Sequence, residues 1–292
     1  MAATAIANAS STTERPTEQT YMGGFSAPKI NHIKTAFIGC GARSKVHISQ
    51  LATLKGVEVV GVCDLFEDLV EEAKKRVQQA GGPIPHKGIK GYFGDAHNYK
   101  KMLVETNPDL VYVLTPWEWH ARMAIDTMKA GAHVCVEVPL TLSLEESWQV
   151  VDTTELTQKH CMMLENVNYG RDELLFLNMC RQGVFGELLH GEAAYIHDLR
   201  KQMHHVTKGR GTGSWRTFHW VQRNGNLYPT HGLGPVSQYM NLGRTEDNFR
   251  HLTSFSSPSL NRRLYAKNHL PDDHKLNHIE FKSGDINPSI IN

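Results

Sequence analysis

The stretch KTAFIGCGARSKVHISQLATL, residues 34–54, decides the fold. It begins as an apolar run of strand length, turns at GCG, and continues with apolar residues at helical spacing from Val46 to Leu54. In a strand, glycine turn and helix of this kind, backbone N–H groups and the helix N-terminus can face a pyrophosphate. The third glycine of the G-x-G-x-x-G pattern is replaced by Ser44, which still permits close packing of the helix. On this motif alone, a tight turn that binds no ligand remains an alternative interpretation.

An acidic residue follows at the place where a bound dinucleotide would need it. The next apolar run, GVEVVGVCDLF over residues 56–66, ends with Asp64, roughly 20 residues beyond Gly41. A carboxylate at this place accepts hydrogen bonds from the adenosine ribose hydroxyls and disfavours a 2′-phosphate. With Gly39 and Gly41 in the turn, the sequence therefore predicts NAD rather than NADP, unless Arg43 compensates.

Strands alternate with helices up to about residue 169. DLVYVLTP (109–116) and HVCVEVP (133–139) are further predicted strands, and each is followed by a helical pattern. This alternation predicts an α/β fold with a parallel sheet that helices cover on both faces. We expect a disordered tail over 1–31, a Rossmann dinucleotide-binding domain over 32–169, and a partial α+β substrate-binding domain over 170–292.

The second half has a different pattern. Residues 172–186 predict one helix, 187–199 (ELLHGEAAYIHDL) predict a strand, and further short strands are expected near 250–265 and 276–282. The chain ends at SGDINPSIIN, residues 283–292, which is a further predicted strand. Either the second domain is small or the sequence is cut short, and we expect an open sheet that is truncated at its C-terminus.

The composition excludes several classes of function. The hydrophobic share is 40%, the charged share 21% and the formal net charge +1, so no basic excess points to nucleic acid or anionic lipid. No apolar run approaches the length of a membrane span. The five cysteines form no ligand pattern and no disulfide framework. We expect no nucleic-acid partner, no membrane partner and no metal, and no signal peptide is visible.

The segment TPWEWH follows the strand that begins near residue 109. Ligands of open α/β sheets bind at the carboxyl ends of the strands. Trp117 and Trp119, on either side of Glu118, either close an edge of the core or stack on a flat ligand. His120 either binds there or caps the next helix. Glu137 ends the following strand on the same edge, so we expect its carboxylate to point toward the nicotinamide end of the site.

The order G-x-G-x-x-x, D, T-P-x-x-x-H and E-x-P resembles the Gfo/Idh/MocA oxidoreductase family over roughly residues 33–170. Members of that family typically have E-K-P, in which the lysine serves as acid and base for the alcohol being oxidised. Val138 stands in the place of that lysine here. A plain dehydrogenase would therefore lack its usual proton acceptor.

Four later blocks make the resemblance more specific. MLENVNYGRDE, LNMCRQGVFGE, AAYIHDLR and GNLYPTHGLGP occur in that order between residues 163 and 235. They are similar to glycoside hydrolase family 109, the NAD-dependent α-N-acetylgalactosaminidases, and the resemblance covers residues 33–292. Members of that family continue further and place another tyrosine at the substrate. The resemblance implies NAD as cofactor and a small molecule or glycan carrying N-acetylgalactosamine as substrate.

For that family, the resemblance implies hydrolysis through a transient oxidation. The sugar is oxidised at carbon 3 by enzyme-bound NAD, and the resulting ketone acidifies the proton on carbon 2, which a base removes. The aglycone then leaves from carbon 1, water adds to the unsaturated intermediate, and the hydride returns. No net redox change occurs, and the usual pair of catalytic carboxylates is not needed.

The resemblance also assigns residues to the two ligands. Those that would contact the dinucleotide are Arg43, Ser44, Asp64, Trp117, Glu118, Trp119, His120, Glu137, Val138 and Asn166. Those that would face the sugar are Tyr195, Arg216, Tyr228, Pro229, Thr230 and His231.

The loop YPTH can supply proton transfer in the absence of the usual lysine. Pro229 stiffens it, so that Tyr228 and His231 are held on one rigid segment. Histidine exchanges protons near neutral pH, and we expect Tyr228 and His231 to be catalytic. The alternatives are that His231 is a buried histidine with hydrogen bonds to the backbone, and that Arg216 forms a surface ion pair. Glu137 would then accept hydrogen bonds from the nicotinamide ribose or from substrate hydroxyls.

Two other functions stay open at this point. One is a conventional NAD-dependent sugar dehydrogenase with a different base, and the other is an inactive NAD-binding fragment. Relatives of this type often carry a twin-arginine signal, so the resemblance implies a periplasmic or secreted location. A homo-oligomer is also left open.

Overall fold

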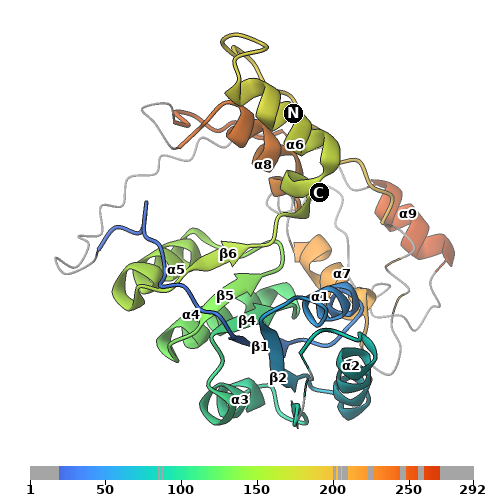
Figure 1. The fold of residues 1–292 in the computed structure, drawn as a ribbon. Helices are drawn as coiled ribbons and strands as arrows, with labels where there is room; N and C mark the ends of the chain where they lie inside the picture. The colour runs from blue at the N-terminus through green and yellow to red at the C-terminus, as the bar shows by residue number, and fades with distance from the viewer. Residues whose placement is uncertain are drawn as a thin grey trace. The chain divides into compact units, whose positions relative to one another are not determined.

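The computed structural model describes residues 20–84, 86, 88–199, 202, 205, 210–222, 226–243, 248–255 and 260–269 (Figure 1). The chain divides into two compact units between Leu164 and Glu165. Each unit is a separate body with its own elements.

A six-stranded parallel sheet forms the centre of the first unit (Figure 1). Its strands are β1 (Ile33–Ile38), β2 (Val57–Cys63), β3 (Lys90–Tyr92), β4 (Leu110–Val113), β5 (His133–Val136) and β6 (Cys161–Met163). The strand order β3-β2-β1-β4-β5-β6 reverses direction between β1 and β4. In doubly wound sheets, the crevice at this reversal is where ligands bind. The predicted parallel α/β fold is confirmed.

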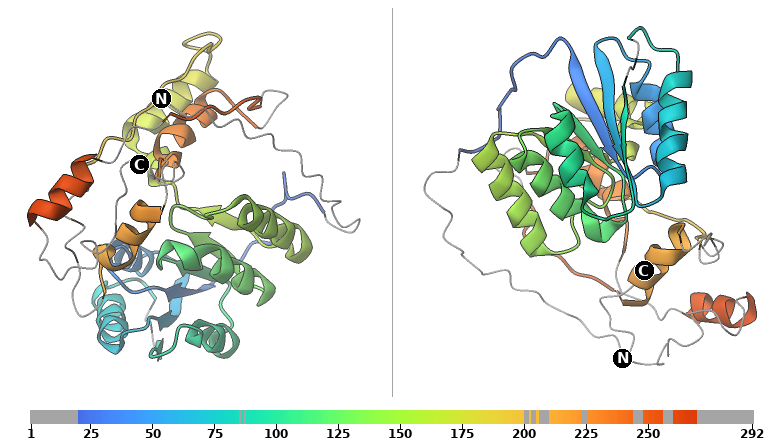
Figure 2. Two further views of the ribbon diagram at one scale, coloured as in Figure 1. Left: turned by 180° about the vertical axis from the view of Figure 1, so that it is seen from behind. Right: turned by 90° about the horizontal axis from the view of Figure 1, so that it is seen from below.

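Helices cover both faces of this sheet (Figure 2). One face packs against α1 (Ser44–Leu51) and α2 (Glu67–Gln79), and the other packs against α3 (Asn98–Thr106), α4 (His120–Lys129) and α5 (Leu144–Thr157). Side chains of a strand alternate between the two faces. Phe37 of β1 therefore joins the core beneath α1 and α2, whereas Ala36 and Ile38 join the core beneath the other three helices. Both faces are thus buried, which explains the nearly continuous apolar run of β1.

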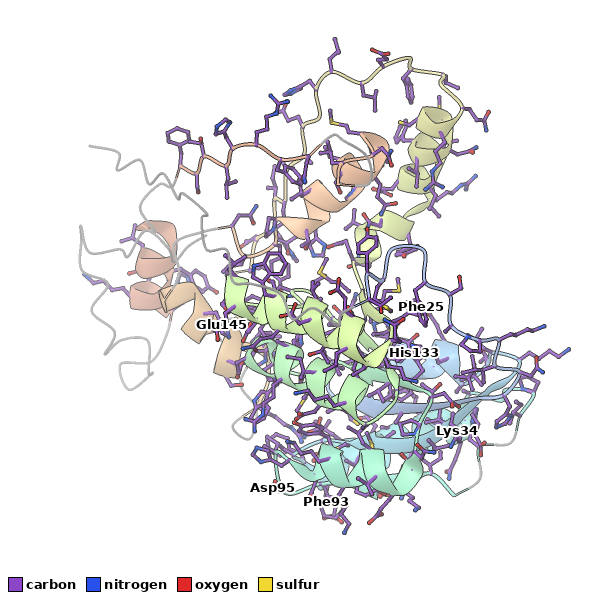
Figure 3. All side chains as sticks on the ribbon, turned by 90° about the vertical axis from the view of Figure 1, so that its left-hand side faces the viewer. Phe25, Lys34, Phe93, Asp95, His133 and Glu145 are labelled. Atoms are coloured by element: carbon purple, nitrogen blue, oxygen red, sulfur yellow. The ribbon has the colours of Figure 1, made fainter. Side chains whose placement is uncertain are left out.

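Part of the predicted tail packs against the first unit. The side-chain amide of Gln158 donates a hydrogen bond to the carbonyl of Thr20 at 3.3 Å. The rings of Phe25 and His160 lie 5.1 Å apart, and the ring of His133 lies 5.3 Å from that of His160 (Figure 3). Thr20 and Phe25 therefore lie near the starts of β5 and β6, while residues 1–19 lie outside the described part of the chain.

All the elements that the structure assigns in the second unit are helices. Its helices are the 3-10 helix η2 (Asn166–Tyr169), α6 (Arg171–Arg181), α7 (Thr212–Gln222), α8 (Thr230–Tyr239) and α9 (Leu260–His269). The predicted helix over 172–186 corresponds to α6. No strand is assigned among the described residues after β6.

Two predicted strands of the second unit are corrected by the structure. Residues 187–199 are described and have no regular secondary structure, and the segment lies against α8 instead of pairing with a strand. Residues 260–265 belong to α9, whose sequence LNRRLYAKNH is rich in good helix formers. The strand predicted over 276–282 lies outside the described residues. The prediction from strand propensity was wrong here because a strand also needs a neighbouring strand with which to pair.

None of the described helices has both the length and the apolar character needed to cross a membrane. Within the described residues, no group of three or more histidine, cysteine, aspartate or glutamate side chains could hold a metal ion.

Candidate active site

The glycine turn after β1 has a shape that only glycine permits at its first position. Gly39 has a φ of +91°, and a Cβ added there would lie 2.7 Å from the backbone carbon and oxygen of Leu114. A side chain would have to displace the end of β4. At Gly41, in contrast, an added Cβ would meet nothing within 4 Å. The turn is therefore tight against the sheet and open on its outer side.

Hydrogen bonds within the first unit hold this turn in place. The buried hydroxyl of Ser44, the first residue of α1, donates to the carbonyl oxygen of Gly41 at 2.7 Å. The amide of Cys40 donates to Oδ2 of Asp64 at 2.7 Å, and the amide of Phe66 donates to its Oδ1 at 3.1 Å. Asp64 is thereby fixed directly after β2 and beside the turn. An open glycine turn, a helix N-terminus and a fixed carboxylate fit a dinucleotide.

Glu137, which follows β5, has two partners on α1 and just before it. Arg43 Nε donates to Glu137 Oε1 at 2.6 Å, and His47 Nε2 lies 3.0 Å from the same oxygen. Burial alone would raise the pKa of Glu137, but the hydrogen bonds to His47 and Arg43 outweigh it and hold the pKa below its usual value. The carboxylate is thus kept ionised near the carboxyl end of the sheet.

His47 was missed by the sequence analysis. The signal that could have found it is its spacing, because residues four apart such as Arg43 and His47 share one side of a helix. Arg43 is half exposed, and its Nε is engaged by Glu137. Val138, next to Glu137, is only 6% exposed and presents an apolar side chain.

The tryptophan pair lies in the short helix η1 (Trp117–Trp119). Trp117 is buried, so it closes an edge of the core. Trp119 packs partly against the core beneath α3, α4 and α5. The ring centres of Trp119 and His97 lie 5.8 Å apart in an edge-to-face arrangement, and the Arg122 guanidinium lies 5.6 Å from the Trp119 ring centre. Glu118 is exposed between them. The sequence predicted that these tryptophans either close an edge of the core or stack on a flat ligand. The burial of Trp117 agrees with the first of these roles.

His120 begins α4 and is 1% exposed. Its Nδ1 lies 2.7 Å from the carbonyl oxygen of Pro139, and its Nε2 lies 2.7 Å from that of Thr115. Burial lowers the pKa of His120, although both hydrogen bonds oppose this effect. The ring therefore ties the segment after β5 to the segment after β4.

In the second unit, the predicted sugar-facing residues form one aromatic cluster. The ring centres of Tyr195, Tyr228 and His231 lie 5.1 to 5.2 Å from one another. Tyr228 and His231 are stacked at an angle of 3°. The Arg216 guanidinium lies 5.5 Å from the Tyr228 ring centre, which is within reach of a cation–π contact. Burial raises the pKa of Tyr195, and the charge of Arg216 opposes the shift.

A cavity of about 250 Å³ opens beside this cluster within the second unit, and Tyr195, Tyr228 and Pro229 contribute to its lining. Pro229 and Thr230 differ from the expected loop, because Pro229 is the cap of α8 and Thr230 is its first residue. Proline suits the start of a helix, where no intrahelical N–H bond is lost. His231 is thus held by the first turn of a helix.

Glycines let the chain approach α8 closely enough to build the cluster. A Cβ at Gly232 would lie 2.8 Å from Ala193 Cβ, and one at Gly191 would lie 2.5 Å from Val236 Cγ1. The segment that carries Tyr195 therefore lies directly on α8.

Glu165 is a buried residue of the second unit that the sequence analysis did not single out. It is 2% exposed, its Oε1 lies 2.6 Å from His231 Nδ1, and the same oxygen accepts the amide of Val167 at 3.0 Å. Asn166, the next residue, is exposed at the start of η2 and belongs to the second unit. The stretch CMMLENVNY, residues 161–169, held a signal for Glu165, because a glutamate that follows an apolar run needs a partner.

Two family models together match nearly all of the chain after residue 32. Residues 33–165 match the model described as "Oxidoreductase family, NAD-binding Rossmann fold", and residues 169–292 match "Glycosyl hydrolase 109, C-terminal domain". The predicted NAD-binding Rossmann domain and its cofactor are thereby confirmed.

Similar proteins agree with these matches. "Glycosyl hydrolase family 109 protein 1" of Akkermansia muciniphila is 55% identical over 271 residues, which cover 93% of this chain and 55% of that protein. "Alpha-N-acetylgalactosaminidase" of Shewanella oneidensis is 52% identical over 285 residues, which cover 98% of this chain and 61% of that protein. The chain therefore spans little more than half the length of the curated relatives it matches.

Solved structures support the fold. The crystal structure of myo-inositol 2-dehydrogenase from Lactobacillus plantarum aligns with a TM-score of 0.56 and 20% identity, and covers 72% of this chain and 57% of that one. At this identity the likeness shows the fold alone. With both domain types matched in order and relatives above half identity along almost its whole length, the chain belongs to glycosyl hydrolase family 109.

Proposed function

We propose that this protein is part of, or is itself, a glycosidase that removes terminal α-N-acetylgalactosamine from glycans by way of bound NAD. The observation that carries the proposal is the pairing of an NAD-binding unit that lacks a lysine after Glu137 with a second unit that holds a tyrosine–histidine cluster. The relative from Shewanella oneidensis that bears the name alpha-N-acetylgalactosaminidase supports the choice of sugar.

In the first unit, the chain's own residues would hold the dinucleotide. The open side of Gly41 and the N-terminus of α1 suit the pyrophosphate, and Asp64 suits the adenosine ribose. Arg43, Ser44, Glu137 and the segment from Trp117 to His120 border the same end of the sheet. When bound, NAD supplies a hydride acceptor that is regenerated within each turnover, so hydrolysis consumes no oxidant.

Val138 makes a simple alcohol oxidation unfavourable at this site. A buried valine has no group that takes a proton from a sugar hydroxyl, so we place the acid and base among the predicted sugar-facing residues. We assign that role to His231 and Tyr228, whose rings are stacked on each other. Histidine can exchange a proton near neutral pH, and it would remove the proton from carbon 2 of the oxidised sugar.

Arg216 and Tyr195 would bind and orient the substrate. Arg216 brings a positive charge to the Tyr228 ring face, where it can also stabilise an oxygen that gains negative charge. Tyr195, whose pKa is raised by burial, keeps its proton; its hydroxyl lies 2.7 Å from His197 Nδ1, and its side chain borders the cavity in which a sugar would bind. Pro229 and Thr230 fix the first turn of α8, which presents His231.

The test is to compare glycoside cleavage with cofactor balance. The purified protein is incubated with a chromogenic aryl α-N-acetylgalactosaminide, and the released aglycone, the NADH and the NAD retained on the protein are measured. The proposal predicts aglycone release without accumulation of NADH. His231→Gln should abolish the release, whereas His190→Gln, a change at an exposed histidine of the same unit, should not.

Two other results would point elsewhere. NADH formed from free sugar in proportion to product would indicate a conventional sugar dehydrogenase. Retained NAD with neither reaction would indicate an NAD-binding protein without catalysis.

A further inference from the structure

We infer that Glu165 is a positioning residue for His231, which it holds in the tautomer that carries its proton on Nδ1. The inference rests on the proposed function for the role of His231, but the contact itself is a property of the second unit. Glu165 Oε1 lies 2.6 Å from His231 Nδ1, and the two residues are 66 positions apart in the sequence. A carboxylate accepts and cannot donate, so Nδ1 must be the donor.

The burial of Glu165 makes this contact strong and directional. The side chain is 2% exposed, and its Oε1 also accepts the amide of Val167, which fixes the carboxylate plane. Among the described residues, no hydrogen-bond donor meets its other oxygen, Oε2. A buried carboxylate with so few partners is costly, and the proton on His231 Nδ1 is the main one it has. Removing either residue would therefore leave the other inadequately paired.

The backbone of α8 is adapted to this contact. Gly234 lies about one helical turn after His231, and a Cβ there would sit 2.7 Å from Asn168 Oδ1 and 3.2 Å from Glu165 Cγ. A larger residue at this position would crowd the side chains of Asn168 and Glu165, so glycine favours the close approach of α8 to η2. The stack of His231 on Tyr228 fixes the ring plane in addition, so both its position and its tautomer are defined.

The chemical consequence concerns Nε2 of the same ring. If Nδ1 carries the proton, the Nε2 lone pair is free to accept one, which a general base requires. When Nε2 has taken a proton, the ring is positively charged and Glu165 lies directly against it. Glu165 would thus hold His231 in the tautomer that can act as a base, and it would stabilise the imidazolium cation that forms.

The test measures the tautomer directly and the kinetics separately. In protein labelled with ¹⁵N-histidine, the His231 signals are identified by their loss in His231→Gln, and the ¹⁵N shifts of Nδ1 and Nε2 report which nitrogen bears the proton. We expect Nδ1–H in the natural protein and a mixture of tautomers in Glu165→Gln. In the glycosidase assay, Glu165→Gln should lower kcat by about 100-fold or more with little change in KM, and Glu165→Asp, which keeps the charge, should restore part of it.

A control variant separates positioning from folding. Glu187→Gln makes the same chemical change at an exposed site of the second unit and should alter neither the tautomer nor kcat. If the natural protein has His231 protonated on Nε2, or if Glu165→Gln leaves both the tautomer and kcat unchanged, the inference is wrong. A natural protein without glycosidase activity but with Nδ1–H that depends on Glu165 would refute the proposed function and leave the positioning intact.

Discussion

Replacement of Gly39 by alanine tests whether the glycine turn is as tight as the structure shows. The added Cβ would lie 2.7 Å from the backbone carbon and oxygen of Leu114, and 3.0 Å from the amide nitrogen of Thr115. Backbone at the end of a central strand cannot move aside as a flexible side chain can. Gly39 also has a φ of +91°, a conformation that L-residues rarely adopt.

The size of the effect follows from two costs. An L-residue in a left-handed conformation costs about 1–2 kcal/mol, and overpacking a tight site adds about 1–3 kcal/mol. We therefore expect Gly39→Ala to lower the free energy of unfolding of the first unit by about 2–5 kcal/mol, a large part of a domain's stability. Gly131→Ala isolates the first cost, because Gly131 has a φ of +94° and open space around it.

Urea unfolding, followed by tryptophan fluorescence and by circular dichroism, provides the measurement. Gly39→Ala should have a clearly lower midpoint than Gly131→Ala, which in turn should lie modestly below the natural protein. Equal midpoints for the two variants would show that the close approach to Leu114 carries no cost, and would refute the reasoning about the turn.

Two further changes separate ligand binding from folding. Gly41→Ala should leave the urea midpoint nearly unchanged but weaken NAD binding at least tenfold by calorimetry, because the new Cβ enters open space that the pyrophosphate would fill; unchanged affinity would contradict this. Glu137→Gln should lower stability by about 1–3 kcal/mol at neutral pH, since it removes a buried charged acceptor from Arg43 and His47. The pKa of Glu137 is lowered in the folded protein, so its contribution is fully present above the unfolded value of about 4.3 and is lost as the pH falls through the folded one. The stability difference between the two proteins should therefore shrink below about pH 4, and a constant difference in urea midpoint across pH would count against the pairing.

The fold of the first unit could be predicted because its signals are local. The strand period, the helix period and the glycine turn all lie within short windows around residues such as Gly39, and Asp64 follows at a known distance. The doubly wound order then places the carboxyl ends of β1, β4 and β5 side by side at one end of the sheet, as the connection rules for such sheets require. The burial of His120 has no local signal of this kind, and the spacing of Arg43 and His47 does not identify Glu137 as their common partner.

The second unit was harder to predict because its decisive contacts are remote. The segment 187–199 looks like a strand with mixed faces, but it packs closely on α8 and forms no strand. Pro229 is compatible with a stiff loop and with a helix start, and only the structure distinguishes them. The contact between Glu165 and His231 joins residues from different elements, and no spacing rule connects them.

The most direct test of the central claim is the fate of the hydrogen on carbon 2 of the sugar. When the glycoside is cleaved in deuterated water, mass spectrometry and proton NMR of the released N-acetylgalactosamine report whether that position has exchanged with solvent. The account predicts deuterium on carbon 2 of the product, because a base on the protein removes that proton during each turnover. Cleavage at full rate with the original hydrogen still on carbon 2 would contradict it.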